Sequence, residues 1–232
     1  MNGVELNTLA ISRGAFELRD ITFDVPMSST AFLMGPNGAG KSSLLFALLG
    51  FLRPVAGHIR VLGEVPHVRS RRFARAVGFV PDSHDDVIEE LTGEEFLNLH
   101  RRLRASGRDE RRRWEADADA LAASLDLTAL PSRIASYSHG MRKKVQLVAA
   151  LQSAPELLVL DEPFNGLDLA SQQAVEGIVR GHAAAGGVVV GAVHSVEHAE
   201  RCADQVLVVS RGSVCAVDPG AVRSRLNGGG AS

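Results

Sequence analysis

A glycine-rich loop at residues 35–42 constrains this chain more than any other feature of its sequence. It reads Gly-Pro-Asn-Gly-Ala-Gly-Lys-Ser and matches the pattern G-x-x-x-x-G-K-[ST]. The apolar residues 31–34 precede it as a short strand, and residues 41–52 follow with leucines at helical spacing. Between a strand and a helix, such a loop directs successive N–H groups and the helix N-terminus at a phosphate. The sequence therefore predicts a phosphate-binding loop in an α/β fold.

The residues of this loop have separate expected tasks. Lys41 is expected to reach the β- and γ-phosphates of ATP, and the Ser42 hydroxyl is expected to bind Mg²⁺. Backbone N–H groups would supply most of the other contacts. The predicted nucleotide-binding residues are Gly35, Pro36, Asn37, Gly38, Ala39, Gly40, Lys41, Ser42 and Ser43.

Two acidic residues, Asp161 and Glu162, follow the apolar run at residues 157–160. A strand that ends in two acids places carboxylates at the carboxyl edge of a sheet, where ligands of open α/β sheets bind. We expect Asp161 to bind Mg²⁺ directly or through water, and Glu162 to act as general base or to orient the attacking water. The alternative is two acids that begin an ordinary loop, and the upstream phosphate loop argues against it.

The rest of the chain divides by its apolar pattern. Alternating apolar residues near the start predict antiparallel strands, and residues 58–80 predict further strands. Charged, Ala- and Leu-rich helical stretches follow, and later apolar runs predict buried parallel strands and a hairpin at Arg211-Gly212. We expect one domain over residues 1–217, with an inserted helical subdomain at about 83–152, and a short flexible tail over residues 218–232. The helical stretches are residues 94–105, 109–125 and 140–152.

Composition narrows the class of partners. The chain of 232 residues has a formal net charge of −2, so no nucleic-acid partner and no general attraction to an anionic membrane are expected. The run Arg111-Arg112-Arg113 is soon followed by Glu115 and Asp117, which favours a solvated helix of mixed charge. No segment approaches the ~18 apolar residues that span a bilayer. Another chain would have to supply any membrane-spanning part.

Three further stretches complete a pattern that a known family shows. Tyr137-Ser138-His139-Gly140-Met141 opens a predicted helix, Asn165-Gly166-Leu167-Asp168 follows the two acids, and His194 follows an apolar run. With the phosphate loop, they make residues 4–217 resemble the ABC ATPases. The resemblance implies an α/β fold of the P-loop NTPase type, an ABC ATPase domain with an antiparallel β subdomain and an inserted helical subdomain.

The resemblance also implies roles for these stretches. Asp168 would belong to the D-loop, which joins two sites across a dimer, and His194 would hydrogen-bond the γ-phosphate and align Glu162 with water. Lys41, Glu162 and His194 would be the catalytic residues. The signature would act in trans, capping the γ-phosphate held by a second subunit through N–H donors and the helix dipole. Its residues are Ser138, His139, Gly140 and Met141.

The chain departs from the family pattern at three places. Asp82 stands where the family has a glutamine, and we expect it to bind Mg²⁺ and couple the site to a partner. His139 replaces a signature glycine, and Met141 a glutamine. No aromatic residue stands where the family stacks one on adenine, so Arg13 or Phe16 is the candidate for that contact.

The stretch from Gly78 to Asp82 and residues 91–97 resemble the branch whose partners are ABC-2-type exporters. The resemblance implies an ATPase of an ABC transporter that drives export through a separate membrane-spanning permease subunit. It also implies a second ABC domain, identical or a paralogue, and a cytoplasmic position on the inner face of the membrane. Two alternatives stay open: a soluble ABC ATPase of a non-transport machine, and a regulatory module that binds ATP.

Overall fold

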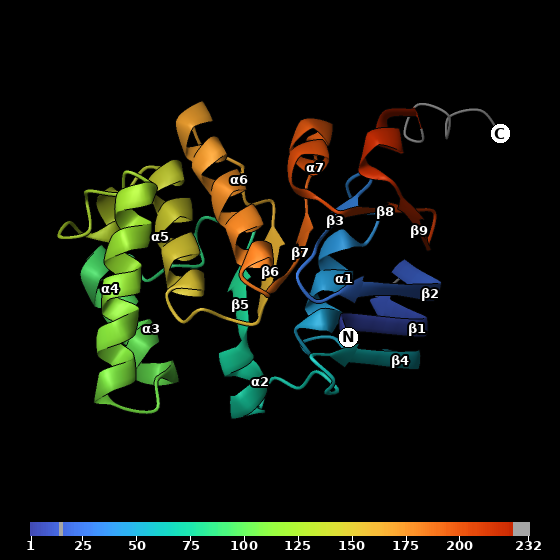
Figure 1. Cartoon of the computed structure of the whole chain (residues 1–232), viewed down its shortest axis with the longest axis horizontal. Helices are drawn as coiled ribbons and strands as arrows, with labels where there is room; N and C mark the ends of the chain where they lie inside the picture. Colours follow the sequence, from blue (N-terminus) through green and yellow to red (C-terminus); the bar gives the residue numbers. More distant parts are fainter. Residues whose placement is uncertain (14–15, 225–232) are drawn as a thin grey trace.

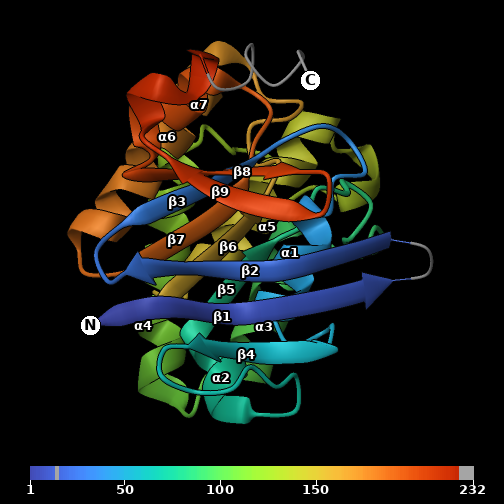
Figure 2. The same cartoon turned by 90° about the vertical axis from the view of Figure 1, so that its right-hand side faces the viewer.

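The computed structural model describes residues 1–13 and 16–224, and of Arg13 and Phe16 it describes the backbone only. The strands form two sheets, seen from two sides in Figures 1 and 2. The smaller sheet is antiparallel, has the order β2-β1-β4, and confirms the antiparallel strands predicted near the start of the chain. Its strands are β1 (Asn2–Arg13), β2 (Phe16–Pro26) and β4 (Ala56–Val61).

The larger sheet contains the parallel strands that the apolar runs predict. Its order is β5-β6-β7-β3-β8-β9, and only the β8–β9 pair is antiparallel. That pair is the predicted hairpin, which turns through Arg211 and Gly212, both at positive φ. The strands are β3 (Thr30–Met34), β5 (Val77–Val80), β6 (Leu157–Asp161), β7 (Val188–Ala192), β8 (Gln205–Ser210) and β9 (Ser213–Val217).

The two faces of the larger sheet belong to two apolar cores. Along β3, Ala31 and Leu33 join the core that contains α1 (Lys41–Leu48) and the antiparallel sheet. Phe32 and Met34 join the other core, because successive side chains of a strand point to opposite faces. That second core contains α6 (Leu169–Ala184) and α7 (Val196–Cys202). Strands covered on both faces explain the continuous apolar runs in the sequence.

The helical segment lies beside β5, the edge strand of the larger sheet (Figure 1). It contains α3 (Gly93–Arg104), α4 (Arg108–Ser124) and α5 (His139–Leu151), close to the three predicted helical stretches. Thr92 and Glu95 form a capping box that begins α3, since each side chain accepts a hydrogen bond from the other residue's backbone N–H. A short 3₁₀ helix, η1 (Ile134–Ser136), precedes α5.

Three α-helices were not predicted: α2 (Arg71–Ala76), α6 and α7. Residues 58–80 were expected to form strands only, but α2 lies between β4 and β5. The Ser70 hydroxyl begins this helix by accepting the N–H of Phe73, and Phe73 is its buried side chain. A six-residue helix with a single buried residue gives no apolar period in the sequence, so its cap was the available signal.

The segment after residue 217 begins with ordered structure. Residues 219–221 form the 3₁₀ helix η2 (Pro219–Ala221), and Val222 is fully buried in the core that contains α7. This part of the predicted flexible tail therefore packs on the domain, and residues 225–232 lie outside the described residues. Within residues 1–13 and 16–224, no helix is both long and apolar enough to cross a bilayer.

Candidate functional site

The phosphate loop connects β3 to α1, as predicted. Gly35, Gly38 and Gly40 all have positive φ, a conformation that favours glycine. A Cβ on Gly35 would also lie 2.2 Å from the carbonyl oxygen of Val209, so no other residue fits there. Lys41 is 7% exposed, and its Nζ donates to the carbonyl oxygens of Gly35 at 2.9 Å and Pro36 at 3.3 Å. The loop thus curls around its own lysine.

A cavity of about 550 Å³ collects most of the predicted site residues. The phosphate loop forms one wall, and the carboxyl ends of β5, β6 and β7 contribute the opposite one. Asn165, which was predicted only as part of the D-loop stretch, also reaches the cavity. The lining residues are Asn37, Gly38, Gly40, Lys41, Ser42, Ser43, Asp82, Asp161, Glu162, Asn165 and His194.

Glu162 is the buried acid of this cavity. It is 7% exposed and has a φ of +47°, a left-handed conformation that is uncommon for a non-glycine residue and concentrates at functional sites. Burial raises its pKa to about 7; the charge of Lys41 opposes this effect, and those of Asp161 and Asp82 add to it. Nε2 of His194 lies 3.1 Å from Oε1 of Glu162. A carboxyl group with a pKa near neutrality is suited to accept a proton from water.

The oxygen atoms around Asp161 suit Mg²⁺. Burial raises the pKa of Asp161, and the Ser42 hydroxyl, which donates to its carboxylate, lowers it. Asp82 faces the same cavity. Among the described residues, no three acidic, histidine or cysteine side chains are grouped closely enough to hold a metal alone. Mg²⁺ usually takes one or two carboxylates and completes its shell with waters and substrate phosphates, so Ser42, Asp82 and Asp161 are the residues that could hold it.

The loop that carries Asp82 is held by α5. Lys143 is fully buried, and its Nζ donates to the carbonyl oxygens of Pro81 at 2.6 Å and Asp82 at 3.1 Å. Gln146 donates to Ser83 in the same loop at 2.9 Å. Burial lowers the pKa of Lys143, and the charge of Asp82 opposes that effect. Sequence reasoning missed Lys143; its signal was a lysine in a helix whose next residues are mostly apolar.

The signature residues do not line the cavity that contains Lys41. Ser138 caps α5, and its hydroxyl accepts the N–H of Met141 at 3.2 Å. The ring of His139 packs against His84, with centroids 5.1 Å apart. A Cβ on Gly140 would lie 2.8 Å from the carbonyl oxygen of Gly166, so the signature packs closely on the D-loop stretch.

Three other expectations from the sequence have three different outcomes. Asp168 caps α6, accepting the N–H of Ser171 at 2.8 Å, and its role across a dimer stays a prediction. His198 was expected at the surface, but its side chain is 12% exposed. The side chains of Arg13 and Phe16, the candidates for the adenine contact, lie outside the described residues.

His198 is buried because α7 packs against α6 and the loop after β6. Its ring stacks on Phe164 with centroids 3.9 Å apart and an interplanar angle of 15°. Its Nδ1 lies 2.9 Å from Oε1 of Glu176, a carboxylate that Arg201 also contacts at 3.3 Å. The stack therefore joins the segment after Glu162 to the helix after His194.

The fold and this cavity define a P-loop domain that binds nucleotides. Residues 18–165 match the family described as ABC transporter, and the chain belongs to that family. It is 36% identical to the cobalt import ATP-binding protein CbiO of Rhodobacter capsulatus, over 91% of this chain and 76% of that protein. It is 34% identical to the Nod factor export ATP-binding protein I of Rhizobium sp., over 83% of this chain and 62% of that protein.

The solved structure of an ATP-binding subunit of an ABC transporter superimposes with a TM-score of 0.86 at 29% identity, covering 99% of this chain and 95% of that one. The predicted ABC ATPase fold is therefore confirmed. Some relatives are much longer, and the chain spans 37–38% of the length of two Streptomyces proteins.

Proposed function

We propose that this chain is the ATP-binding and ATP-hydrolysing subunit of an ABC transporter. The observation that carries the proposal is the buried carboxylate of Glu162, with a pKa of about 7, in one cavity with Lys41 and Asp161. The phosphate loop would hold the phosphates through its N–H groups and Lys41. Mg²⁺, held by Ser42 and Asp161 with Asp82 close by, would neutralise charge on the β- and γ-phosphates.

Glu162 would act on the attacking water. The water oxygen forms a bond to the γ-phosphorus while the bond to the β-phosphate oxygen breaks, and Glu162 accepts the proton that the water loses. ADP and phosphate are the products. His194, whose Nε2 lies 3.1 Å from Oε1 of Glu162, would hydrogen-bond the γ-phosphate beside that carboxylate. The low exposure of Glu162 supports this arrangement, because exclusion of water strengthens the electrostatic contacts.

A second ABC domain would complete the site. The signature residues of this chain do not line its own nucleotide cavity. Ser138 caps α5 by accepting one N–H, and the other N–H groups at the start of this helix could donate to an anion. Two such domains, identical or paralogous, would close head to tail around two ATP molecules. Each α5 N-terminus would then meet the γ-phosphate held by the other domain.

The membrane-spanning permease would bind in a second hollow. A groove of about 800 Å³ runs along β5, the loop after it and α3, and most of its exposed lining is apolar. Ile88 is 42% exposed and Leu103 is 67% exposed at this groove, which suits a short apolar helix from a cytoplasmic loop of the permease. Pro81 lines the groove and Asp82 lines the nucleotide cavity, so movement of one would reach the other.

This partner would place the chain on the cytoplasmic face of the membrane. Asp82 and residues 91–97, which resemble the ABC-2-type branch, support export as the direction of transport. Replacing Leu103 with Glu tests the groove. We expect the variant to bind ATP but to lose co-purification with its membrane-spanning permease. Retained co-purification would move the permease contact elsewhere.

The Glu162→Gln variant tests the proposed function. We expect steady-state turnover to fall by ~10²–10⁴ while ATP binding persists, so that ATP-dependent dimers accumulate in size-exclusion chromatography. The matched control is Glu17→Gln, which changes a carboxylate on β2 outside the cavity and should behave as the wild type. Unchanged turnover in Glu162→Gln would remove Glu162 from its assigned role.

A further inference from the structure

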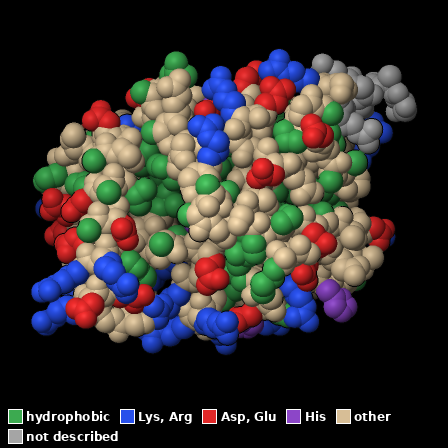
Figure 3. Space-filling model, in the orientation of Figure 1, with side chains coloured by type: hydrophobic (Ala, Val, Ile, Leu, Met, Phe, Trp, Pro, Cys, Tyr) green, Lys and Arg blue, Asp and Glu red, His purple; other side chains and the backbone are tan. Residues whose placement is uncertain are grey.

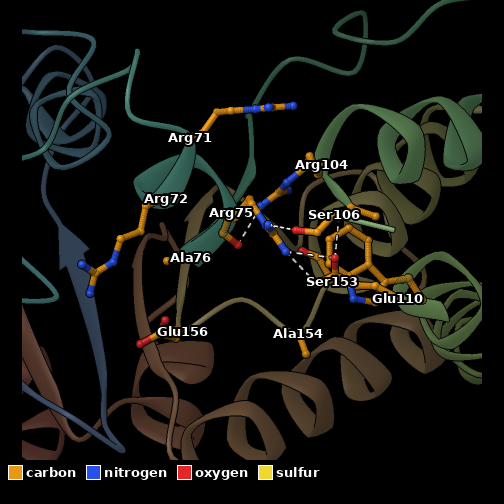
Figure 4. A pocket seen from close by; sticks show the side chains of 12 residues that line it. Arg71, Arg72, Arg75, Ala76, Arg104, Ser106, Glu110, Ser153, Ala154 and Glu156 are labelled. Atoms are coloured by element: carbon orange, nitrogen blue, oxygen red, sulfur yellow. Dashed lines mark hydrogen bonds and ion pairs between the residues drawn. The ribbon is translucent and has the colours of Figure 1, made fainter. Parts of the chain in front are cut away.

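A second polar hollow, of about 640 Å³, is lined by none of the nucleotide-site residues. Its walls are α2, the turn from α3 to α4, and the turn from α5 to β6. Figure 4 shows the arginines of this pocket, with Arg75 reaching across to the α3–α4 turn and Arg72 extending away from the group. We call it the arginine pocket; its arginines are Arg71, Arg72, Arg75 and Arg104.

Two of these arginines are fixed in place by partners. Nη2 of Arg75 donates to both carboxylate oxygens of Glu110, at 2.7 and 2.9 Å, and its Nη1 donates to the Ser106 hydroxyl. Nη2 of Arg104 donates to the carbonyl oxygens of Ala74 and Val77, each at 2.7 Å. These contacts join α2 to the helical segment, so the side chains of Arg75 and Arg104 are held in defined positions.

Other polar groups of the pocket remain without partners. Ser153 is 9% exposed, and within the described residues its buried hydroxyl has no hydrogen-bond partner; the same holds for Nε of Arg104. Arg71 is exposed, and no ion pair holds it in the described part of the chain. Buried polar groups in native proteins are nearly always hydrogen-bonded to protein, water or a ligand, so these two donors have capacity for a further contact.

The pocket also has an excess of positive charge. Its lining contains four arginines but only two acids, Glu110 and Glu156, and of the arginines Arg72 pairs with Glu64 outside the pocket at 2.9 Å. Burial lowers the pKa of Arg104, and the neighbouring charge of Arg75 lowers it further. An anion in the pocket would oppose both effects, because it stabilises the charged form of Arg104.

We propose that the arginine pocket binds the phosphate group of an anionic ligand. Arg71 and Nε of Arg104 would donate to phosphate oxygens, and the Ser153 hydroxyl would add a third donor. Guanidinium groups suit this task because their planar N–H donors match the geometry of phosphate and never lose their charge. The ligand is either the headgroup of an acidic phospholipid or a soluble phosphate compound.

The position of the pocket favours the lipid headgroup. Arg104 lines both the arginine pocket and the apolar groove, so the two hollows are neighbours. Figure 3 shows Lys and Arg atoms gathered along the lower edge of the molecule, where α2 and the lower ends of α3 and α4 lie in Figure 1. If the groove takes the permease, as we propose above, this edge is held beside the membrane, where acidic headgroups attract basic residues. The choice of source, but not the phosphate site itself, rests on that proposed function.

Two binding measurements test the site without using ATP turnover. The first titrates inorganic phosphate into the chain by calorimetry, in a Lys41→Ala background that weakens the phosphate loop. The second measures flotation with phosphatidylcholine vesicles, with and without phosphatidic acid. Arg71→Gln should weaken phosphate binding about tenfold or more, and Ser153→Ala about two- to tenfold, because each removes one hydrogen bond to a charged group. Arg19→Gln, an exposed arginine on β2, is the matched control.

The outcomes separate the two sources. Binding of phosphate and of acidic vesicles, both weakened by the pocket variants, assigns the site to a phospholipid headgroup. Binding of phosphate alone assigns it to a soluble phosphate compound. No phosphate binding, or equal losses in Arg19→Gln and Arg71→Gln, overturns the proposal. Since neither readout involves hydrolysis, a failure here and a failure of the Glu162→Gln experiment are distinguishable.

Discussion

Nε2 of His194 lies 3.1 Å from Oε1 of Glu162, yet that oxygen is buried and, within the described residues, has no hydrogen-bond partner. The two atoms are close, but their orientation does not make a hydrogen bond. An unpaired carboxylate oxygen in a polar cavity is free to accept a hydrogen bond from water. This oxygen is therefore the acceptor on which a general-base role for Glu162 would rest.

The pH dependence of turnover tests Glu162 as the base. Burial raises its pKa to about 7, and a general base acts only when ionised. We expect kcat/KM for ATP to fall about tenfold per pH unit below pH ~7. Circular dichroism over the same range checks that the chain stays folded. A flat profile down to about pH 5 would show that another group accepts the proton.

The same raised pKa predicts a pH-dependent stability. Between about pH 4.5 and about pH 7, the folded protein keeps a proton on Glu162 that the unfolded chain has released. Stability therefore falls as pH rises through this window, and the loss is complete above it. Glu162→Gln removes that loss, so it should be more stable than the wild type by ~1 kcal/mol or more at about pH 8 and by less at about pH 4. Thermal unfolding at both pH values checks this, and an equal difference at the two would contradict it.

Asp82→Asn tests the carboxylate that replaces the family's glutamine. The charge of Asp82 raises the pKa values of Glu162 and Asp161, and its Oδ1 accepts a weak hydrogen bond from Asn165 at 3.4 Å. We expect the variant to move the midpoint of the kcat/KM profile to lower pH. It should also raise the Mg²⁺ concentration for half-maximal activity about tenfold. If neither quantity changes, Asp82 has no part in binding the metal or setting the pKa of Glu162.

The sequence predicted the central part of the site because its elements leave local signals. Strands β3, β6 and β7 are buried on both faces and appear as apolar runs. The glycine loop and Asp161-Glu162 follow two of these runs directly. Parallel strands bring their carboxyl ends to one edge, so order along the chain sufficed to place Lys41 near Glu162.

Features that depend on packing between distant segments could not be predicted in this way. His198 is buried because its stacking partner Phe164 and its hydrogen-bond partner Glu176 lie in other elements. Lys143 is buried because the loop after β5 presents two carbonyl oxygens to it. Neither set of partners is close in sequence, and a lone His or Lys is more often exposed. The arginine pocket likewise forms only when α2 meets the α3–α4 turn.

Replacing His198 tests how much its stack and its contact with Glu176 contribute to stability. Replacing it with Ala removes a partner of Glu176, which is 4% exposed, and removes the ring stacked on Phe164. We expect the free energy of unfolding in urea to fall by about 1–3 kcal/mol, since Arg201 alone would then pair the buried carboxylate. His198→Gln keeps a hydrogen-bond donor and should recover part of the loss. Equal losses in both variants would show that the ring, rather than the contact with Glu176, provides the stability.

The Lys143→Met variant tests the contact between α5 and the loop after β5. Methionine fills similar space but leaves the carbonyl oxygens of Pro81 and Asp82 without their buried donor. We expect a loss of about 1–3 kcal/mol in the free energy of unfolding. Asp82 would also lose its support, so the Mg²⁺ concentration for half-maximal activity should rise as it does in Asp82→Asn.

Lys144→Met is the matched control for this variant. Lys144 is the next residue of α5 and is also buried, but among the described residues it makes no hydrogen bond to that loop. It should therefore leave the Mg²⁺ dependence unchanged. If Lys143→Met changes stability but not the Mg²⁺ dependence, Lys143 supports the fold without positioning Asp82. If both variants change the Mg²⁺ dependence equally, the cause is loss of positive charge on α5, because charge is the property that the two substitutions share.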